Sequence, residues 1–103
     1  MNIEQAAPRF AALSDPSRLA ILHLLVRAGP EGLSAGRIAT DLAATPSRTS
    51  FHLAKLVEAQ LIRSRREARA IIYAVRFETL GALLSWLIDD CCDGSESLRK
   101  CCR

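Results

Sequence analysis

Two pairs of adjacent cysteines, Cys91-Cys92 and Cys101-Cys102, lie near the carboxyl end of this 103-residue chain and include all of its cysteines. Thiolates bind soft, thiophilic ions. Adjacent residues on a helix point about 100° apart, so both sulfurs of a pair can reach one ion only where the helix frays. No histidine follows residue 52, so any ion site in this region must be rich in sulfur. The cysteines therefore predict a thiol-based sensing site, and incidental thiols in a tail remain the alternative.

The expected redox environment of these thiols is reducing. The amino-terminal segment lacks a basic region followed by an apolar one, so we expect no secretory signal and a cytoplasmic protein. No apolar run approaches the roughly 20 residues of a membrane span, so no membrane partner is expected. Structural disulfides are then disfavoured, and zinc sites generally use separated pairs such as C-x₂-C. A soft ion bound by sulfur fits the adjacent pairs better.

Positive charge is concentrated in one third of the chain. The whole chain has a formal net charge of +3, whereas residues 45–76 contain seven basic and only two acidic residues. Four of these are arginines between residues 63 and 69. A local cationic field of this kind favours a polyanion over a small acidic substrate. We find no pairing of a nucleophile with a base and no phosphate-binding loop, so we do not expect an enzyme.

The elements that must position these residues follow from caps and periodicity. We expect a helix over 4–13, for which the sequence signal is weak. A second helix should start at Ser14-Asp15-Pro16 and stop at Ala28-Gly29-Pro30. The apolar face of the second helix would contain Leu19, Leu22, Leu25 and Val26, with His23 as a buried or half-buried structural residue. Residues 30–33 would form a loop.

A helix-turn-helix pattern follows. Ser34 can cap a short helix through Leu42, residues 43–45 form the turn, and Thr45-Pro46 starts the next helix, which runs through Ala59. Its expected apolar positions are Phe51, Leu53, Leu56 and Val57. In such a motif the start of the second helix enters the major groove of DNA. The residues expected to read base edges are Ser47, Arg48, Thr49, Ser50 and His52.

After this motif the spacing of the apolar residues changes. Residues 61–66 and 70–75 predict two strands of a hairpin, and helical spacing returns from Glu78 or Thr79 into residues 89–92. The hairpin would contact DNA phosphates through Arg65, Arg66 and Arg69. The fold class is thus mainly α with a small β-hairpin, a winged helix-turn-helix. We expect one such domain over residues 1–92 and a flexible cysteine-containing tail over 93–103.

The segments SDPSRLAILHLL, IATDLAATPSRTSFHLAKLVEAQLI and RSRREARAIIYAV resemble the ArsR/SmtB family of metal-sensing repressors over roughly residues 9–90. The resemblance implies a homodimer in which the first and last helices pair across the two-fold axis. It also implies repression by binding operator DNA and release when an inducer binds. No permanently bound cofactor is implied.

The inducer implied by the resemblance is trivalent arsenic, although this chain departs from the best-known arrangement of arsenic-binding cysteines. The C-V-C site of the founding arsenite sensors is absent, since this chain has Leu33-Ser34-Ala35-Gly36 there. Cys91 and Cys92 match a pair that other members carry at the end of the last helix, with Cys101 or Cys102 as a third ligand. Arsenite takes three sulfurs and a monosubstituted organoarsenical two, so both stay open. The usual glycine at the hairpin tip is Ala68 here.

Three other functions remain compatible with the sequence. A redox sensor would use the same cysteines and respond to oxidants. A sensor of cadmium, lead or another thiophilic metal would differ only in selectivity. A constitutive DNA-binding or protein-interaction module with an inert tail would be unchanged when all four cysteines are removed.

Overall fold

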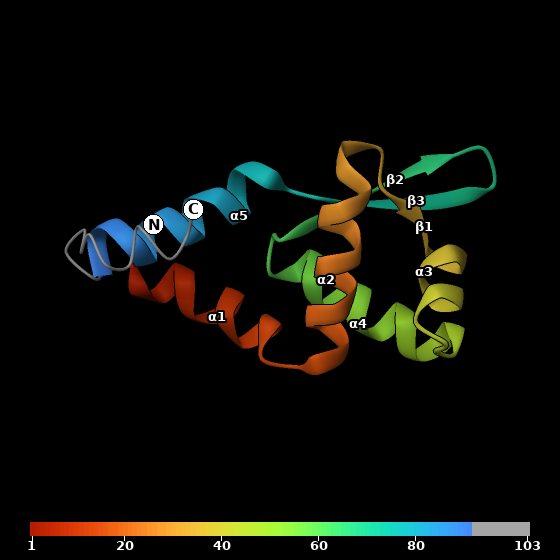
Figure 1. Ribbon diagram of the computed structural model, residues 1–103, viewed down its shortest axis with the longest axis horizontal. Coiled ribbons are helices and arrows are strands. Elements are labelled where there is room, and N and C mark those ends of the chain that lie inside the picture. The colour runs from red at the N-terminus through yellow and green to blue at the C-terminus, as the bar shows by residue number, and fades with distance from the viewer. Residues whose placement is uncertain (92–103) are drawn as a thin grey trace.

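A computed structural model describes residues 1–91 of the chain, with side chains through residue 88. It is mainly helical with a small antiparallel sheet, which confirms the winged helix-turn-helix fold. The elements in chain order are α1 (Ile3–Leu13), α2 (Pro16–Ala28), the 3₁₀ turn η1 (Gly29–Glu31), β1 (Leu33–Ser34), α3 (Ala35–Asp41), α4 (Pro46–Glu58), β2 (Ile62–Glu67), β3 (Ala70–Val75), α5 (Phe77–Ser85) and the π-helical segment η2 (Trp86–Cys91) (Figure 1).

Side-chain caps explain where the helices begin. The Asp15 carboxylate accepts hydrogen bonds from the backbone of Ser17 and Arg18 at the start of α2, and Thr45 caps α4. A proline follows each of these caps at the first helical position, where the missing N–H is not needed. Asn2 and Gln5 form a capping box on α1, which was not predicted from the sequence. The last helix begins at Phe77, one or two residues before the predicted start at Glu78 or Thr79.

The sheet has three strands in the order β1-β3-β2, one more than the sequence predicted. The strand β1 pairs Leu33 with Tyr73, so residues 30–33 do not form a simple loop. Gly32, which precedes β1, has a φ of +72°, and a Cβ there would lie 2.2 Å from the Tyr73 carbonyl oxygen. Only glycine therefore allows β1 to approach β3 this closely.

The core lies between α2, α3, α4 and the base of the sheet. The largest fully buried side chains are Ile21, Leu25, Ile38, Leu53, Leu56, Leu61, Ile62, Leu83 and Val75. In α2 the buried face is formed by residues 21, 22 and 25. This places Leu19 and Val26 at its margins, 51% and 39% exposed, and His23 on the opposite, solvent-facing side. The prediction of a buried or half-buried His23 is therefore wrong.

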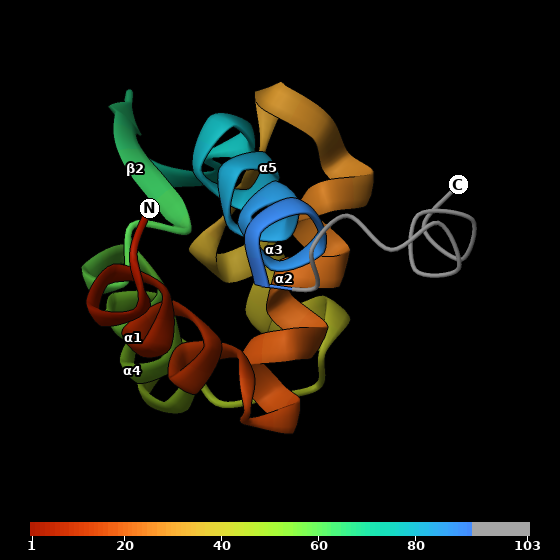
Figure 2. The ribbon, with the colours of Figure 1, turned by 90° about the vertical axis from the view of Figure 1, so that its left-hand side faces the viewer.

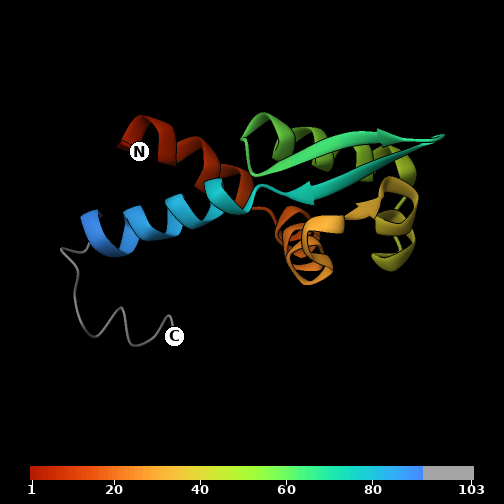
Figure 3. The same ribbon diagram turned by 90° about the horizontal axis from the view of Figure 1, so that it is seen from above.

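The molecule is elongated, with principal extents of 45 × 25 × 23 Å. Helices α1 and α5 extend from one end, whereas the hairpin tip, α3 and the start of α4 lie at the opposite end (Figures 1 and 3). Seen along the long axis, α1 and α5 are separate helices on the end face (Figure 2). No helix among the described residues is long and apolar enough to cross a membrane.

Candidate nucleic-acid interface

The start of α4 is held by its own cap and by the turn before it. The Thr45 hydroxyl accepts a hydrogen bond from the backbone N–H of Arg48 at 3.2 Å. Ala43, in the turn from α3, has a φ of +51°, a left-handed conformation that costs a residue with a Cβ some strain. The side chains of Ser47, Arg48 and Ser50 are all exposed on the first turns of α4. Three of the five predicted base-reading residues therefore face solvent.

The other two predicted base readers, Thr49 and His52, face inward. Thr49 is 2% exposed, and its hydroxyl donates to the Thr45 carbonyl oxygen at 2.9 Å. His52 is 9% exposed and packs beside Leu53 in the buried face of α4. Neither side chain is placed to reach a base edge, so the prediction for these two residues is corrected. Their positions match the helical face i, i+3, i+4, i+7 that ends at Leu56.

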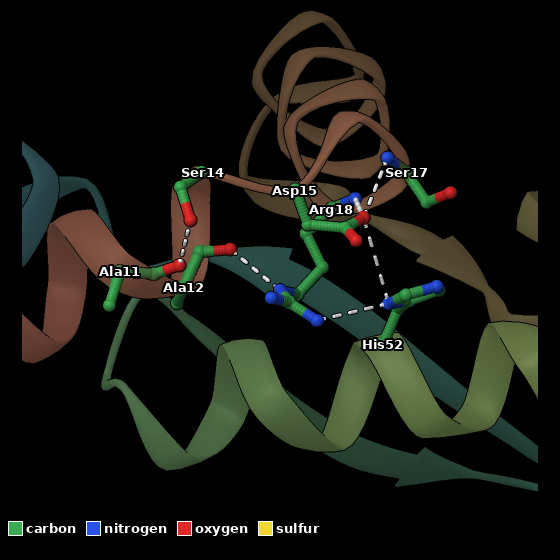
Figure 4. A network of polar contacts seen from close by, with 7 residues as sticks. All are labelled: Ala11, Ala12, Ser14, Asp15, Ser17, Arg18 and His52. Carbon is green, nitrogen blue, oxygen red and sulfur yellow. Dashed lines mark hydrogen bonds and ion pairs between the residues drawn. The ribbon is translucent and has the colours of Figure 1, made fainter.

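A polar network joins His52 to the preceding helices (Figure 4). The Arg18 guanidinium donates through Nε to the Ala12 carbonyl oxygen at 2.7 Å, and its Nη1 lies 3.2 Å from His52 Nδ1. Arginine has only donors, so His52 Nδ1 is the acceptor in this contact. One side chain of α2 thus ties the end of α1 to the middle of α4. This network fixes α4 relative to α1, which extends to the other end of the molecule.

Asp15 completes the network. Its Oδ1 accepts from the backbone N–H groups of Ser17 at 2.8 Å and Arg18 at 3.1 Å, and lies 4.0 Å from His52 Nδ1. The Arg18 backbone hydrogen bond is the main reason that the pKa of Asp15 lies below its ordinary value of 3.8. Desolvation is the next largest effect and raises the pKa, whereas the Ser17 hydrogen bond and the positive charge of Arg18 lower it further.

The hairpin of β2 and β3 carries the second cluster of candidate residues. Residues 63–71 are all exposed, and only the base of the hairpin, at Ile62, Ala74 and Val75, is buried. Its tip is a two-residue turn, because Glu67 pairs with Ala70. Ala68 in this turn has a φ of +56°, the conformation for which glycine is preferred.

The three hairpin arginines predicted to contact phosphates differ from one another. Arg65 is engaged within the protein, since its Nη2 donates to the Glu31 carbonyl oxygen at 2.8 Å and its Nε to Glu67 Oε2 at 3.1 Å. Arg66 and Arg69 form no ion pair with any of the residues 1–88, whose side chains the structure describes. These two are therefore available to an anion, whereas Arg65 would first have to leave its partners.

The cysteines cannot be placed in the same way. Cys91 is the last residue of η2, and its side chain lies outside the described part. Cys92, Cys101, Cys102 and the predicted tail over residues 93–103 lie outside the described residues altogether. Among the residues that the structure does describe, no cluster of three or more histidine, cysteine or acidic side chains could hold a metal ion.

The sequence alone did not reveal the role of one residue at this interface, Arg18, or the exposure of another, Phe51. Arg18 connects the helices, and no local pattern indicates its partners on α1 and α4. Phe51 was predicted at an apolar position of α4, but it is 56% exposed. Helical phase could have revealed this, because Phe51 lies two residues before Leu53 and five before Leu56, and so cannot share their face.

The comparisons with known proteins agree with this geometry. The family model of the helix-turn-helix domain matches residues 13–65. The HTH-type transcriptional regulator YgaV of Escherichia coli (strain K12) is 38% identical over 86 residues, 84% of this chain and 85% of that protein.

Solved structures extend the likeness to the whole winged fold. An ArsR-like transcriptional regulator from Rhodococcus sp. RHA1 superposes with a TM-score of 0.76 at 29% identity, over 94% of this chain and 89% of that one. The homodimeric winged helix-turn-helix DNA-binding domain of Mb0332 from Mycobacterium bovis, a possible ArsR-family regulator, gives a TM-score of 0.70 at 27% identity, over 82% and 76% of the two chains. The chain therefore belongs to the helix-turn-helix transcriptional regulators and shares the fold of their ArsR-like members.

Proposed function

We propose that this regulator is a homodimeric repressor that binds operator DNA through α4 and the hairpin. The observation that carries the proposal is the placement of two kinds of side chain at one end of the molecule. Ser47, Arg48 and Ser50 are exposed at the start of α4, where a recognition helix meets base edges. Arg66 and Arg69 are exposed on the hairpin, where they would neutralise phosphates.

The opposite end of the molecule supplies the proposed dimer contact. Ile3 on α1 and Leu84 on α5 are 69% and 48% exposed, although both helices also bury small or apolar side chains such as Ala6 and Leu83. Exposed apolar groups on two helices that extend from the same end favour burial against a second copy (Figure 3). The homodimeric state of the similar domain from Mycobacterium bovis supports the formation of a dimer.

We further propose that trivalent arsenic, as arsenite or an organoarsenical, is the inducer that releases DNA. The support is the cysteine pair Cys91-Cys92, since Cys91 is the last residue of the segment η2 that continues the last helix of the proposed dimer contact. Soft thiolates suit this ion, and Cys101 or Cys102 would supply a third sulfur. The helix ends in a π-helical segment, a rare conformation that is frequent at functional sites.

Release of DNA by an inducer requires a difference in affinity between two states. Arsenic must bind the DNA-free dimer more tightly than the DNA-bound dimer, typically by about 1–3 kcal/mol. The network of Arg18, Ala12 and His52 offers a physical connection, since it ties the dimer helix α1 to α4. A shift of the dimer helices would then change the spacing between the two recognition helices.

The test is fluorescence anisotropy of labelled DNA from upstream of the gene, under reducing conditions. We expect the chain to bind this DNA, and arsenite or phenylarsenite to release it. The Cys91→Ser, Cys92→Ser double variant should bind DNA equally well and resist release. The Cys101→Ser, Cys102→Ser variant is the matched control, and it should still respond to phenylarsenite, which needs only two sulfurs.

The outcomes separate this proposal from its rivals. Release by arsenic in the Cys91→Ser, Cys92→Ser variant would exclude that pair as the inducer site. Release by an oxidant alone would indicate a redox sensor, and release by cadmium or lead but not arsenic a different metal sensor. DNA binding that no such agent alters would indicate a constitutive module.

A further inference from the structure

The centre of the outer face of α4 carries an exposed aromatic ring. The buried face of this helix is formed by Thr49, His52, Leu53 and Leu56, and Phe51 lies on the opposite side with 56% of its surface exposed. Residues four positions away on a helix are neighbours, so Phe51 lies in one row with Ser47 and Lys55, which are also exposed. A large apolar group therefore stands among polar ones on the surface proposed to enter the major groove.

The ring is held in place by two neighbours. Lys55 Nζ lies 5.5 Å from the Phe51 ring centroid, in a cation–π contact. The His52 ring meets it edge-on, with centroids 5.4 Å apart and planes at 69°. His52 is itself fixed by Arg18. The exposed ring is thus braced from α4 itself, and its position is set before any ligand binds.

The chemistry of the major groove provides one apolar group on the edges of the bases, the C5-methyl of thymine. A phenyl ring offers no hydrogen bond to the other base-edge groups, whereas Ser47, Ser50 and Arg48 around it can make such bonds. A protein partner would require a broader apolar patch, whereas the neighbours of Phe51 on the helix surface at positions 47, 48 and 55 are polar and only the small Ala54 is apolar.

We propose that Phe51 is a specificity-determining residue that contacts a thymine methyl group in the operator. This inference rests on the proposed DNA-binding function and deepens it. The hydroxyls of Ser47 and Ser50 and the Arg48 guanidinium would bond base edges or phosphates around this apolar contact. Thymine is then favoured over cytosine and over uracil at the contacted position.

The experiment exchanges thymine for uracil, which removes only the methyl group. A DNA duplex is first selected with the wild-type chain from a randomised pool, and then prepared with thymine or with uracil throughout. Affinity is measured for both duplexes by anisotropy. We expect wild type to prefer the thymine duplex about fourfold for each methyl contacted, the value of burying one methyl-sized group, and about 16-fold if each subunit of a dimer makes one contact.

Variants separate the contact from other effects of uracil. Removal of every methyl also changes the shape and stiffness of DNA, but this affects all variants alike. Phe51→Ala should lose the roughly fourfold preference per contacted methyl and keep only the difference that DNA shape imposes on every variant. Phe51→Leu should retain part of the contact preference. Leu19→Ala is the matched control, an exposed apolar side chain on α2 that should leave the preference unchanged. Phe51 is exposed, so we expect the urea midpoint of Phe51→Ala to stay close to that of wild type.

The results distinguish the two levels of the proposal. Failure of the wild type to enrich any duplex would overturn the DNA-binding function itself. Sequence-selective binding without a thymine preference, or with a preference that is as large in Phe51→Ala as in wild type, would overturn the role of Phe51 alone. A preference that is equal in wild type and Leu19→Ala and about fourfold smaller per contacted methyl in Phe51→Ala would establish it.

Discussion

The two parts of the proposed DNA-binding surface are built in opposite ways. Helix α4 buries a full face against the core, including Leu53 and Leu56 at 0% exposure, and is tied to α1 and α2 through His52. The hairpin is exposed over residues 63–71 and is buried only at its base. Reading of base edges requires side chains held in register, whereas neutralising phosphates requires only charge within reach. Rigidity is therefore found where the sequence of DNA would be read.

Removal of a packed side chain should destabilise α4 far more than the hairpin. Leu53→Ala should lower the free energy of unfolding by about 2–5 kcal/mol, because a fully buried side chain leaves a cavity. Ile71→Ala on the hairpin is the matched change, and it should cost less than about 1 kcal/mol because Ile71 is 41% exposed. Urea titrations followed by the fluorescence of Trp86 measure both. Equal costs would show that the hairpin is packed as firmly as α4.

The exposed arginines of the hairpin should affect DNA binding through their charge. Arg66→Ala and Arg69→Ala should each weaken DNA binding and reduce the log–log salt slope by about 0.9 for each phosphate that is no longer neutralised. Arg65→Ala should leave the slope nearly unchanged, because its guanidinium is already bonded to Glu31 and Glu67. Anisotropy titrations between about 50 and 200 mM salt give these slopes. An equal reduction of the slope in Arg65→Ala would mean that Arg65 leaves its partners to bind DNA.

The same contrast explains what the sequence could predict. The caps at Asp15-Pro16 and Thr45-Pro46 are local signals, and both start helices where they were expected. The two-residue strand β1 could not be found, because its existence depends on pairing with Tyr73, forty residues away in sequence. Element order is therefore readable from local patterns, whereas short strands that rely on distant partners are not.

Side-chain direction at the site was predicted less well, and α4 shows why. Its apolar positions were selected by hydrophobicity, which placed Phe51 and Val57 with Leu53 and Leu56. The structure buries Thr49 and His52 instead, because helical geometry decides which side faces the core and these two can satisfy their polar atoms there. The engagement of Arg65 depends on η1, a distant element. The cysteines lie at or beyond the limit of the described residues, so their proposed role stays a prediction.

The pH dependence of stability should reveal a smaller difference between α4 and the hairpin. Asp15 caps α2, which carries Arg18 and through it holds His52 of α4, and nothing equivalent is seen on the described hairpin. Because the pKa of Asp15 is lowered in the folded protein, its charge stabilises the fold fully above its ordinary value of 3.8. This contribution is lost as pH falls through the lower pKa of the folded state.

Asp15→Asn tests this contribution, because asparagine can still cap the helix but carries no charge. Wild type should be more stable than Asp15→Asn at pH 7, and the difference should shrink as the pH falls below about 3.8, the ordinary pKa of Asp15. Urea midpoints at pH 7, 5 and 3 measure it. A difference that stays constant down to pH 3 would show that the charge of Asp15 is not what stabilises α2.

The smallest expected effect lies at the hairpin tip, where Ala68 has a φ of +56°. This conformation costs an L-residue about 1–2 kcal/mol, and glycine avoids the cost but gains freedom in the unfolded chain. Ala68→Gly should therefore stabilise the protein by about 0.5–1 kcal/mol. Ala70→Gly, two residues along in β3, should instead destabilise it by a similar amount. Opposite signs in thermal melts would locate the strain in the turn. If Ala68→Gly also changed the salt slope of DNA binding, the hairpin would need a defined shape as well as charge to bind DNA. The hairpin and α4 would then differ only in how strongly each depends on a fixed conformation.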